Sequence, residues 1–105
     1  MVSFDEFKKM EMKVGKIEAA ERVPGADKLY KLDVDTGEKR TIVAGIAQNY
    51  TIDELVGLEI IVVTNLDPKK LRGIESQGML LAAEDGDTVS LLVPLKEIRP
   101  GSEVH

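Results

Sequence analysis

A single short helix pattern lies in the middle of the chain, between two groups of short strand patterns. Thr51 and Glu54 form a capping box, and Gly57 follows, so a helix is predicted over 51–56. Three strand patterns precede it and two or three follow it. An all-β, five-stranded Greek-key barrel of the OB type has this order, with its helix between strands 3 and 4. A β-sandwich is the alternative, and it accommodates a mid-chain helix less well.

The strand patterns are recognised by alternating apolar residues and by the turn residues between them. Pro24-Gly25, Thr36-Gly37 and Asp85-Gly86 mark three turns, and the stretch 65–73, which contains Pro68, is predicted to be a loop. The run 58–64 is apolar and β-branched, which predicts a strand buried on both faces. The expected strands are approximately 12–19, 30–35, 40–46, 58–64, 79–83 and 88–93.

The first strand changes its inward face between Val14 and Ile17. A strand that does so needs a bulge or a bend, and Gly15-Lys16 supplies the glycine for it. Bent strands allow a short sheet to curl into a barrel. The expected fold is therefore a curled sheet rather than a flat one.

The chain begins with a second capping box, formed by Ser3 and Glu6. It predicts a short helix over about 3–10 with Phe4 and Phe7 on one face. Little of the chain remains for these two aromatic side chains to pack on, so they imply a partner surface. The alternative is that this helix plugs one end of its own barrel.

Length and composition fit one soluble domain spanning residues 1–105, with 43% hydrophobic and 31% charged residues. The absence of cysteine excludes a disulfide framework and a thiol-rich zinc site. No apolar run is long enough to span a membrane, and a cytoplasmic location is expected. The net charge of -5 argues against nucleic acid, unless positive charge is concentrated on one face.

No catalytic constellation is present, so the chain is not expected to be an enzyme. His105 is the only histidine and is the last residue, which is a poor position for a general base. The pairs Asp33/Asp35 and Asp85/Asp87 could suggest a cation, but such spacings usually form solvated faces. Neither a metal nor a cofactor is expected.

The stretch 65–76 carries a run of cationic residues with only Asp67 and Glu75 as acidic neighbours. It offers Lys69, Lys70 and Arg72 to phosphates, with Asn65 and Ser76 as neutral hydrogen-bonding groups. A basic loop beside an open barrel face is the usual OB-fold arrangement for oligonucleotides. The other interpretation is a solvated tip, which is the common fate of charge runs.

Six motifs follow one another along the chain: M-K-V-G-K-I (12–17), P-G-A-D-K-L-Y (24–30), R-x-I-V-A-G-I (40–46), E-L-V-G (54–57), N-L-x-P-K-K-L-R-G (65–73) and S-Q-G-M-L-L-A-A (76–83). In this order they resemble the tRNA-binding domain family over about residues 3–104. This module occurs at the C-terminus or as the beta subunit of methionyl-tRNA synthetases, as free dimeric tRNA-binding proteins, and in the endothelial monocyte-activating polypeptide.

The resemblance implies a homodimer that binds tRNA by shape and phosphate contacts, in association with a methionyl-tRNA synthetase catalytic chain. Base stacking is expected to be minor, because Tyr30 alternates with inward residues and only Tyr50 remains. The tRNA-contacting residues it implies are Asn65, Lys69, Lys70, Arg72, Ser76 and Met79, with Arg40 and Lys28 as weaker candidates. The dimer-interface residues it implies are Phe4, Phe7, Leu91, Val93, Ile98 and Val104.

One related branch with this fold assists protein export, so a chaperone-like or protein-interaction module is the competing function. That branch looks less similar to this chain over Asn65–Gly73.

Overall fold

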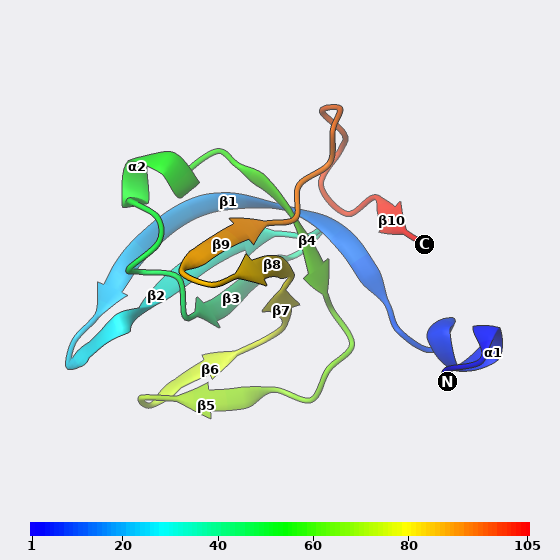
Figure 1. Cartoon of the computed structure of the whole chain (residues 1–105), viewed down its shortest axis with the longest axis horizontal. Helices are drawn as coiled ribbons and strands as arrows, with labels where there is room; N and C mark the ends of the chain where they lie inside the picture. The colour runs from blue at the N-terminus through cyan, green and yellow to red at the C-terminus, as the bar shows by residue number, and fades with distance from the viewer.

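The protein, described here by a computed structural model of residues 1–105, is built around one curled antiparallel sheet (Figure 1). Its strands are ordered β3-β2-β1-β4-β7, and β10 pairs with the free side of β1. These strands are β1 (Met12–Val23), β2 (Ala26–Asp35), β3 (Lys39–Ala44), β4 (Glu59–Val63), β7 (Met79–Leu80) and β10 (Glu103–Val104). The predicted turns at 24–25 and 36–37 connect β1 to β2 and β2 to β3.

Strand β1 is the long element around which the sheet curls. Its first half, Met12–Lys16, pairs with β4, and its second half, from Lys16, pairs with β2. One register irregularity lies between Ile17 and Ala19, slightly beyond the predicted Gly15-Lys16 position, and a second lies between Arg22 and Val23. Gly15 has a different reason to be glycine, because a Cβ there would lie 2.7 Å from the Val34 side chain. The close approach of β1 to β2 therefore requires this residue.

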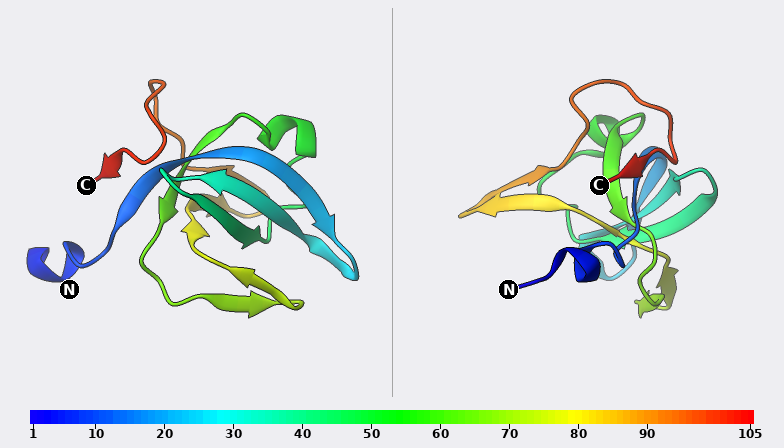
Figure 2. Two further views of the ribbon diagram at one scale, coloured as in Figure 1. Left: turned by 180° about the vertical axis from the view of Figure 1, so that it is seen from behind. Right: turned by 90° about the vertical axis from the view of Figure 1, so that its right-hand side faces the viewer.

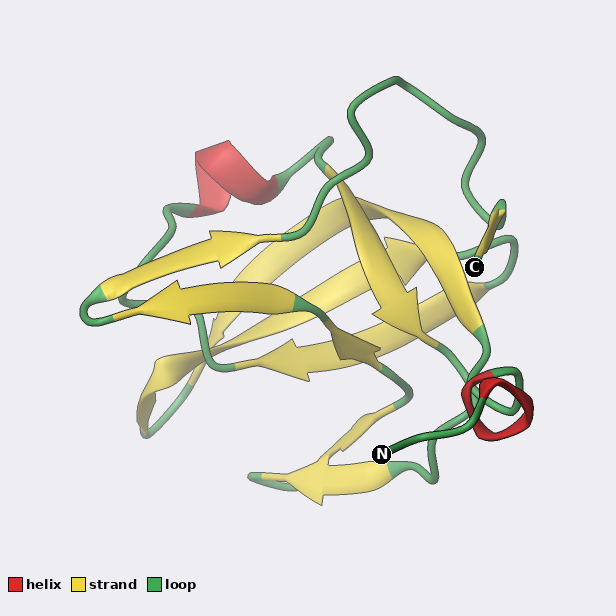
Figure 3. Ribbon diagram, turned by 45° about the vertical axis from the view of Figure 1, so that its right-hand side comes forward, coloured by secondary structure: helices red, strands yellow, loops and turns green.

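Both predicted helices form, and each is a single turn. Helix α1 (Phe4–Phe7) has the complete Ser3/Glu6 capping box, and α2 (Ile52–Leu55) has the complete Thr51/Glu54 box. Helix α2 lies between β3 and β4 in the chain and covers one end of the barrel, whereas α1 stands outside it (Figures 1 and 3). Neither helix has the length or apolar character needed to cross a membrane.

Two small hairpins extend from the main sheet. The first joins β5 (Lys69–Leu71) to β6 (Ile74–Ser76), and the second joins β8 (Ala82–Asp85) to β9 (Thr88–Leu91). The second contains the predicted turn at Asp85-Gly86. The prediction of a loop over 65–73 was wrong in its second half, because residues 69–71 form a strand.

The core is a cluster of aliphatic side chains between the curled sheet, α2 and β9. Leu55 of α2, Ile17 of β1 and Leu32 of β2 are fully buried in it. The fold is mostly β and OB-like, but the hydrogen-bonded sheet does not close into a ring. The outer edge of β3 faces the β6–β7 connection, where side chains replace a continuous ladder of backbone bonds.

Candidate nucleic-acid interface

The β5–β6 hairpin, residues 69–76, presents the cationic cluster and is called the basic hairpin below. Leu71 pairs with Ile74, so Arg72 and Gly73 form a two-residue turn, with φ of 53° and 80°. Positive φ at both central residues is the geometry of a type I′ hairpin turn. Arg72 is the one non-glycine residue of the chain with positive φ. A large side chain in this conformation is unusual and indicates a constraint other than turn stability.

The cations of the basic hairpin are free of carboxylate partners. Lys69, Lys70 and Arg72 are exposed, and none of them belongs to the five ion pairs of the structure. Glu75 lies opposite Lys70 in the strand register but makes no ion pair with it. The hairpin can therefore offer three positive side chains to an anionic ligand.

The tip of the β1–β2 hairpin lies at the same end of the barrel as the tip of the basic hairpin. Both tips are on the left in Figure 1 and on the right in the left view of Figure 2. Lys28 is exposed near the β1–β2 tip, and its carbonyl accepts a hydrogen bond from the backbone of Ala47. The Arg22 guanidinium lies 5.6 Å from the ring centre of Tyr30. These two cations extend the basic character of this end.

Arg40 is placed inside the protein's own hydrogen-bond network. Its guanidinium donates to the Thr36 hydroxyl at 2.9 Å, to the carbonyls of Thr64 at 3.1 Å and Gln77 at 2.9 Å, and to Glu38 at 2.6 Å. Only 16% of its side chain is exposed. Four of the five N–H donors of Arg40 already make hydrogen bonds within the protein, so Arg40 cannot bind a phosphate through two parallel N–H groups.

The side chains of Asn65 and Ser76 are also engaged within the chain. Asn65 donates to the Lys9 carbonyl at 2.7 Å and accepts from the Glu11 amide at 2.9 Å. Ser76 is buried, and its hydroxyl accepts from the Val43 amide and donates to the Gly78 carbonyl. The expected sugar or base contacts from these two residues are therefore not available in this arrangement.

Met79 remains available to a ligand. It lies on β7, opposite Val63 of β4, and 48% of the residue is exposed. The candidates thus divide into exposed groups and internal groups. The exposed ones are Lys28, Lys69, Lys70, Arg72 and Met79, and the internal ones are Arg40, Asn65 and Ser76.

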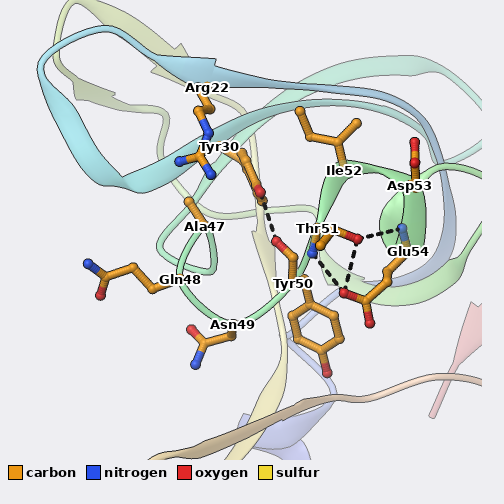
Figure 4. A pocket seen from close by; sticks show the side chains of 10 residues that line it. All are labelled: Arg22, Tyr30, Ala47, Gln48, Asn49, Tyr50, Thr51, Ile52, Asp53 and Glu54. Carbon is orange, nitrogen blue, oxygen red and sulfur yellow. Dashed lines mark hydrogen bonds between the residues drawn. The ribbon is translucent and has the colours of Figure 1, made fainter.

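A pocket of about 350 Å³ lies between α2 and the Arg22 side of the barrel (Figure 4). Tyr30 is buried and donates its hydroxyl to the Tyr50 carbonyl, and the Tyr50 hydroxyl donates to the Val89 carbonyl. Neither hydroxyl is left unpaired, and the ring of Tyr30 is not an open stacking surface. The capping box of α2 occupies the other wall.

One carboxylate next to Arg40 is electrostatically tuned. Glu11 accepts a hydrogen bond from the Thr64 hydroxyl at 2.7 Å and lies 3.7 Å from the Lys13 ammonium. The hydrogen bond, and then the cation, hold the pKa of Glu11 below its ordinary value. Glu11 therefore stays ionised and keeps Thr64 in place. No group of three or more histidine, cysteine or acidic side chains is arranged to hold a metal ion.

The residues expected at a dimer interface are mostly exposed. Phe4 is 69% exposed, and no residue of α1 is buried. Val93 and Ile98 are exposed as well, and Val104 is half-buried in β10. Leu91 is the exception, because it lies in the core with only 6% of its surface exposed. It presents little area to a partner.

A model of the putative tRNA-binding domain family matches residues 12–103. The chain belongs to this family. It is 53% identical over 105 residues to the methionine–tRNA ligase of Pyrococcus furiosus and 54% identical over 104 residues to that of Thermotoga maritima. The two matches include 99% and 98% of this tRNA-binding domain, but only 14% and 16% of the length of the two relatives.

Solved structures show the same architecture. A MetRS-related protein from Pyrococcus horikoshii superposes with a TM-score of 0.94 at 47% identity, covering 100% of this chain and 98% of that one. The CsaA chaperone protein of Picrophilus torridus superposes with a TM-score of 0.92 at 33% identity, covering both chains completely. The resemblance found in the sequence motifs is thereby confirmed.

Two residues of the tRNA-binding domain were not among the sequence candidates. Arg22 lies opposite Tyr30 in the pairing of β1 with β2. The sequence alone does not show this pairing, so it gave no signal for Arg22. Gln77 joins β3 through its side chain, which accepts from the Thr41 amide at 2.9 Å, and through its own amide, which donates to the Thr41 carbonyl at 2.8 Å. Its position in the S-Q-G-M motif was the only available signal.

Proposed function

We propose that this tRNA-binding domain binds folded tRNA without catalysing a reaction, through the basic hairpin together with Lys28 and Met79. The observation that carries the proposal is the exposed, unpaired state of Lys69, Lys70 and Arg72 in a chain of net charge -5. Phosphates are bound by such cations as point charges and, for arginine, as a bidentate fork. Of the two tyrosines, Tyr30 is buried and Tyr50 is only partly exposed, so shape and phosphate contacts outweigh base stacking.

The distribution of ion pairs explains how an acidic domain can attract a polyanion. The paired cations, Lys13, Lys31, Lys39 and Arg40, belong to the main sheet, and each has a carboxylate within 4 Å. The basic hairpin has no such neutralisation. At physiological ionic strength, screening beyond about 8 Å weakens the repulsion from distant carboxylates and leaves the local positive charge effective.

A second copy of the chain is the proposed partner of α1. This helix has four residues, none buried, and isolated helices of this length are not stable in water. Phe4 and Phe7 would be covered by the partner, together with Val93, Ile98 and Val104. A homodimer would also place two basic hairpins on one particle and enlarge the surface available to a folded tRNA.

The proposed setting is the cytoplasm, in association with a methionyl-tRNA synthetase catalytic chain. The relatives named methionine–tRNA ligase are about seven times longer than the region they share with this domain. A tRNA-binding appendage or subunit would raise the local tRNA concentration at such a catalytic chain.

Filter binding to total tRNA at 50 and 200 mM salt tests the proposal. The three cations of one basic hairpin are expected to contribute roughly -2 to -3 to the slope of log affinity against log salt. Lys69→Ala with Arg72→Ala is expected to abolish most of the binding. The control, Lys31→Ala with Lys39→Ala, removes the same charge from paired positions and is expected to retain binding. Equal losses in both double variants would show that only net charge matters.

A chaperone-like function is the second candidate, because the CsaA chaperone protein has the same architecture. It predicts that unfolded peptides bind and that competing tRNA does not displace them. Peptide binding of this kind, combined with tRNA binding that ignores the basic-hairpin substitutions, would favour the chaperone function over tRNA binding.

A further inference from the structure

The two ends of the segment that carries the basic hairpin are held by one nitrogen atom. Arg40 Nη1 donates to the Thr64 carbonyl at 3.1 Å and to the Gln77 carbonyl at 2.9 Å. Thr64 follows β4 on one side of the hairpin, and Gln77 follows β6 on the other. The basic hairpin and the segments that connect it to the main sheet all lie between these two carbonyls in the chain. We call this arrangement the Arg40 clamp.

The remaining bonds of Arg40 fix the guanidinium itself. Its Nε donates to the Thr36 hydroxyl and its Nη2 to Glu38, both at the β2–β3 end of the sheet. Thr36 is buried, with 1% of its surface exposed. The guanidinium is therefore anchored on the main sheet and reaches across to both ends of the segment that carries the basic hairpin.

The seam between β3 and residues 76–78 depends on few other contacts. Gln77 makes two hydrogen bonds with the backbone of Thr41, and the Ser76 hydroxyl accepts a hydrogen bond from the Val43 amide. Neither β5 nor β6 belongs to the main hydrogen-bonded sheet. The orientation of the hairpin relative to the barrel is thus determined by a small set of side chains, with Arg40 at its centre.

We propose that Arg40 is a positioning residue for RNA binding, which fixes the direction of the basic hairpin and does not itself contact phosphate. The inference rests on the proposed function. Asn65 supports the same end of the connection by holding the backbone of Lys9 and Glu11. A lysine at position 40 keeps the positive charge but lacks the planar fork that joins two carbonyls to a hydroxyl and a carboxylate.

The experiment compares Arg40→Lys with the wild type by tRNA filter binding and by amide hydrogen exchange in NMR. Arg40→Lys is expected to lose roughly tenfold in affinity, because the basic hairpin loses the bonds to the Thr64 and Gln77 carbonyls that fix its direction before RNA binds. The amides of Val43 and Gln77 at the seam should exchange faster. The amides of Ile17 and Gly57, which bond to Leu58 and Ile17, should not change. A phosphate contact alone would instead leave the exchange of the Val43 and Gln77 amides unchanged in Arg40→Lys, whatever the loss of affinity.

Gln77→Ala provides a second variant that keeps every charge and retains Arg40. It removes the bond to the Thr41 amide at the same seam, and it is expected to weaken tRNA binding and to speed Val43 exchange. Wild-type affinity in both variants, or faster exchange at Ile17 and Gly57 as well as at the seam, overturns the inference. If the wild type itself does not bind tRNA, the proposed function fails. If only Lys69→Ala with Arg72→Ala loses binding, the role of Arg40 alone fails.

Discussion

Replacing Arg72 with asparagine should stabilise the domain and weaken its tRNA binding at the same time. Arg72 has φ of 53° at the first central position of the β5–β6 turn. The left-handed region costs an L-residue about 1–2 kcal/mol, and asparagine tolerates it because its side chain bonds locally. Asn-Gly is the preferred pair for this turn. Arg72→Asn should therefore gain up to about 1 kcal/mol, an increase in Tm of about 4–8 °C for a domain of this size.

The same substitution removes one of the three free cations of the basic hairpin. Loss of one phosphate contact should reduce the salt slope by about 0.7–0.9 and the affinity at low salt by roughly tenfold. Thermal unfolding followed by circular dichroism and filter binding at several salt concentrations measure the two effects. Arg72→Lys is the matched control, because it keeps the charge and the unfavourable φ. It should retain most of the binding and show no gain in Tm.

The reasoning about Arg72 makes two claims that can fail separately. If Arg72→Asn binds tRNA with an unchanged salt slope, Arg72 does not contact phosphate. If it lowers Tm or leaves it unchanged, the turn does not store the backbone strain assigned to it. Either result would show that Arg72 does not combine a less stable β5–β6 turn with stronger tRNA binding.

Three further substitutions, one of them with a matched control, test the fold. Gly15→Ala places a Cβ 2.7 Å from Val34 and should cost about 1–3 kcal/mol in urea unfolding, whereas Gly45→Ala, whose Cβ would approach no atom closer than 4.0 Å, should be nearly neutral. Tyr50→Phe leaves the Leu91 amide and the Val89 carbonyl without their partner, which should cost about 1–3 kcal/mol; an unchanged urea midpoint would contradict this. The hydrogen bond from the Thr51 amide, and then the one from the Thr51 hydroxyl, lower the pKa of Glu54. The Glu54 carboxylate therefore stabilises the fold at pH values above its pKa in the unfolded chain. This contribution is lost as the pH falls through the pKa of Glu54 in the folded protein. Glu54→Gln should therefore lose less stability than the wild type between pH 7 and pH 3, and equal losses would refute this.

Local signals predicted the parts of the fold that depend on neighbouring residues. Both capping boxes are complete within four residues, so both helices could be located in the sequence. The β5–β6 hairpin was missed because its strands have three residues each and its turn is Arg-Gly rather than Asn-Gly. A run of charges with a proline before it has the composition of a loop.

The roles of the internal candidates could not be predicted for a different reason. Asn65 bonds to Glu11, which is 54 residues away, and Arg40 bonds to Gln77, which is 37 residues away. A polar residue in a motif is equally compatible with a ligand contact and with a structural contact until its partners are known. Leu91 was assigned to a partner surface by the family resemblance, and strand alternation could not correct this assignment because it does not say which face of β9 is inward.

The side-chain seam beside β3 has a consequence for how this domain can diversify. A strand inside a continuous ladder cannot change length without shifting its neighbours, whereas the basic hairpin is attached at two carbonyls and a few side chains. Insertions, deletions or changes of charge between residues 65 and 75 leave the barrel's ladders intact. The basic hairpin, which is proposed to determine the ligand, can thus be replaced as a unit. A hairpin grafted from a homologue should fold on this barrel without redesign of the core.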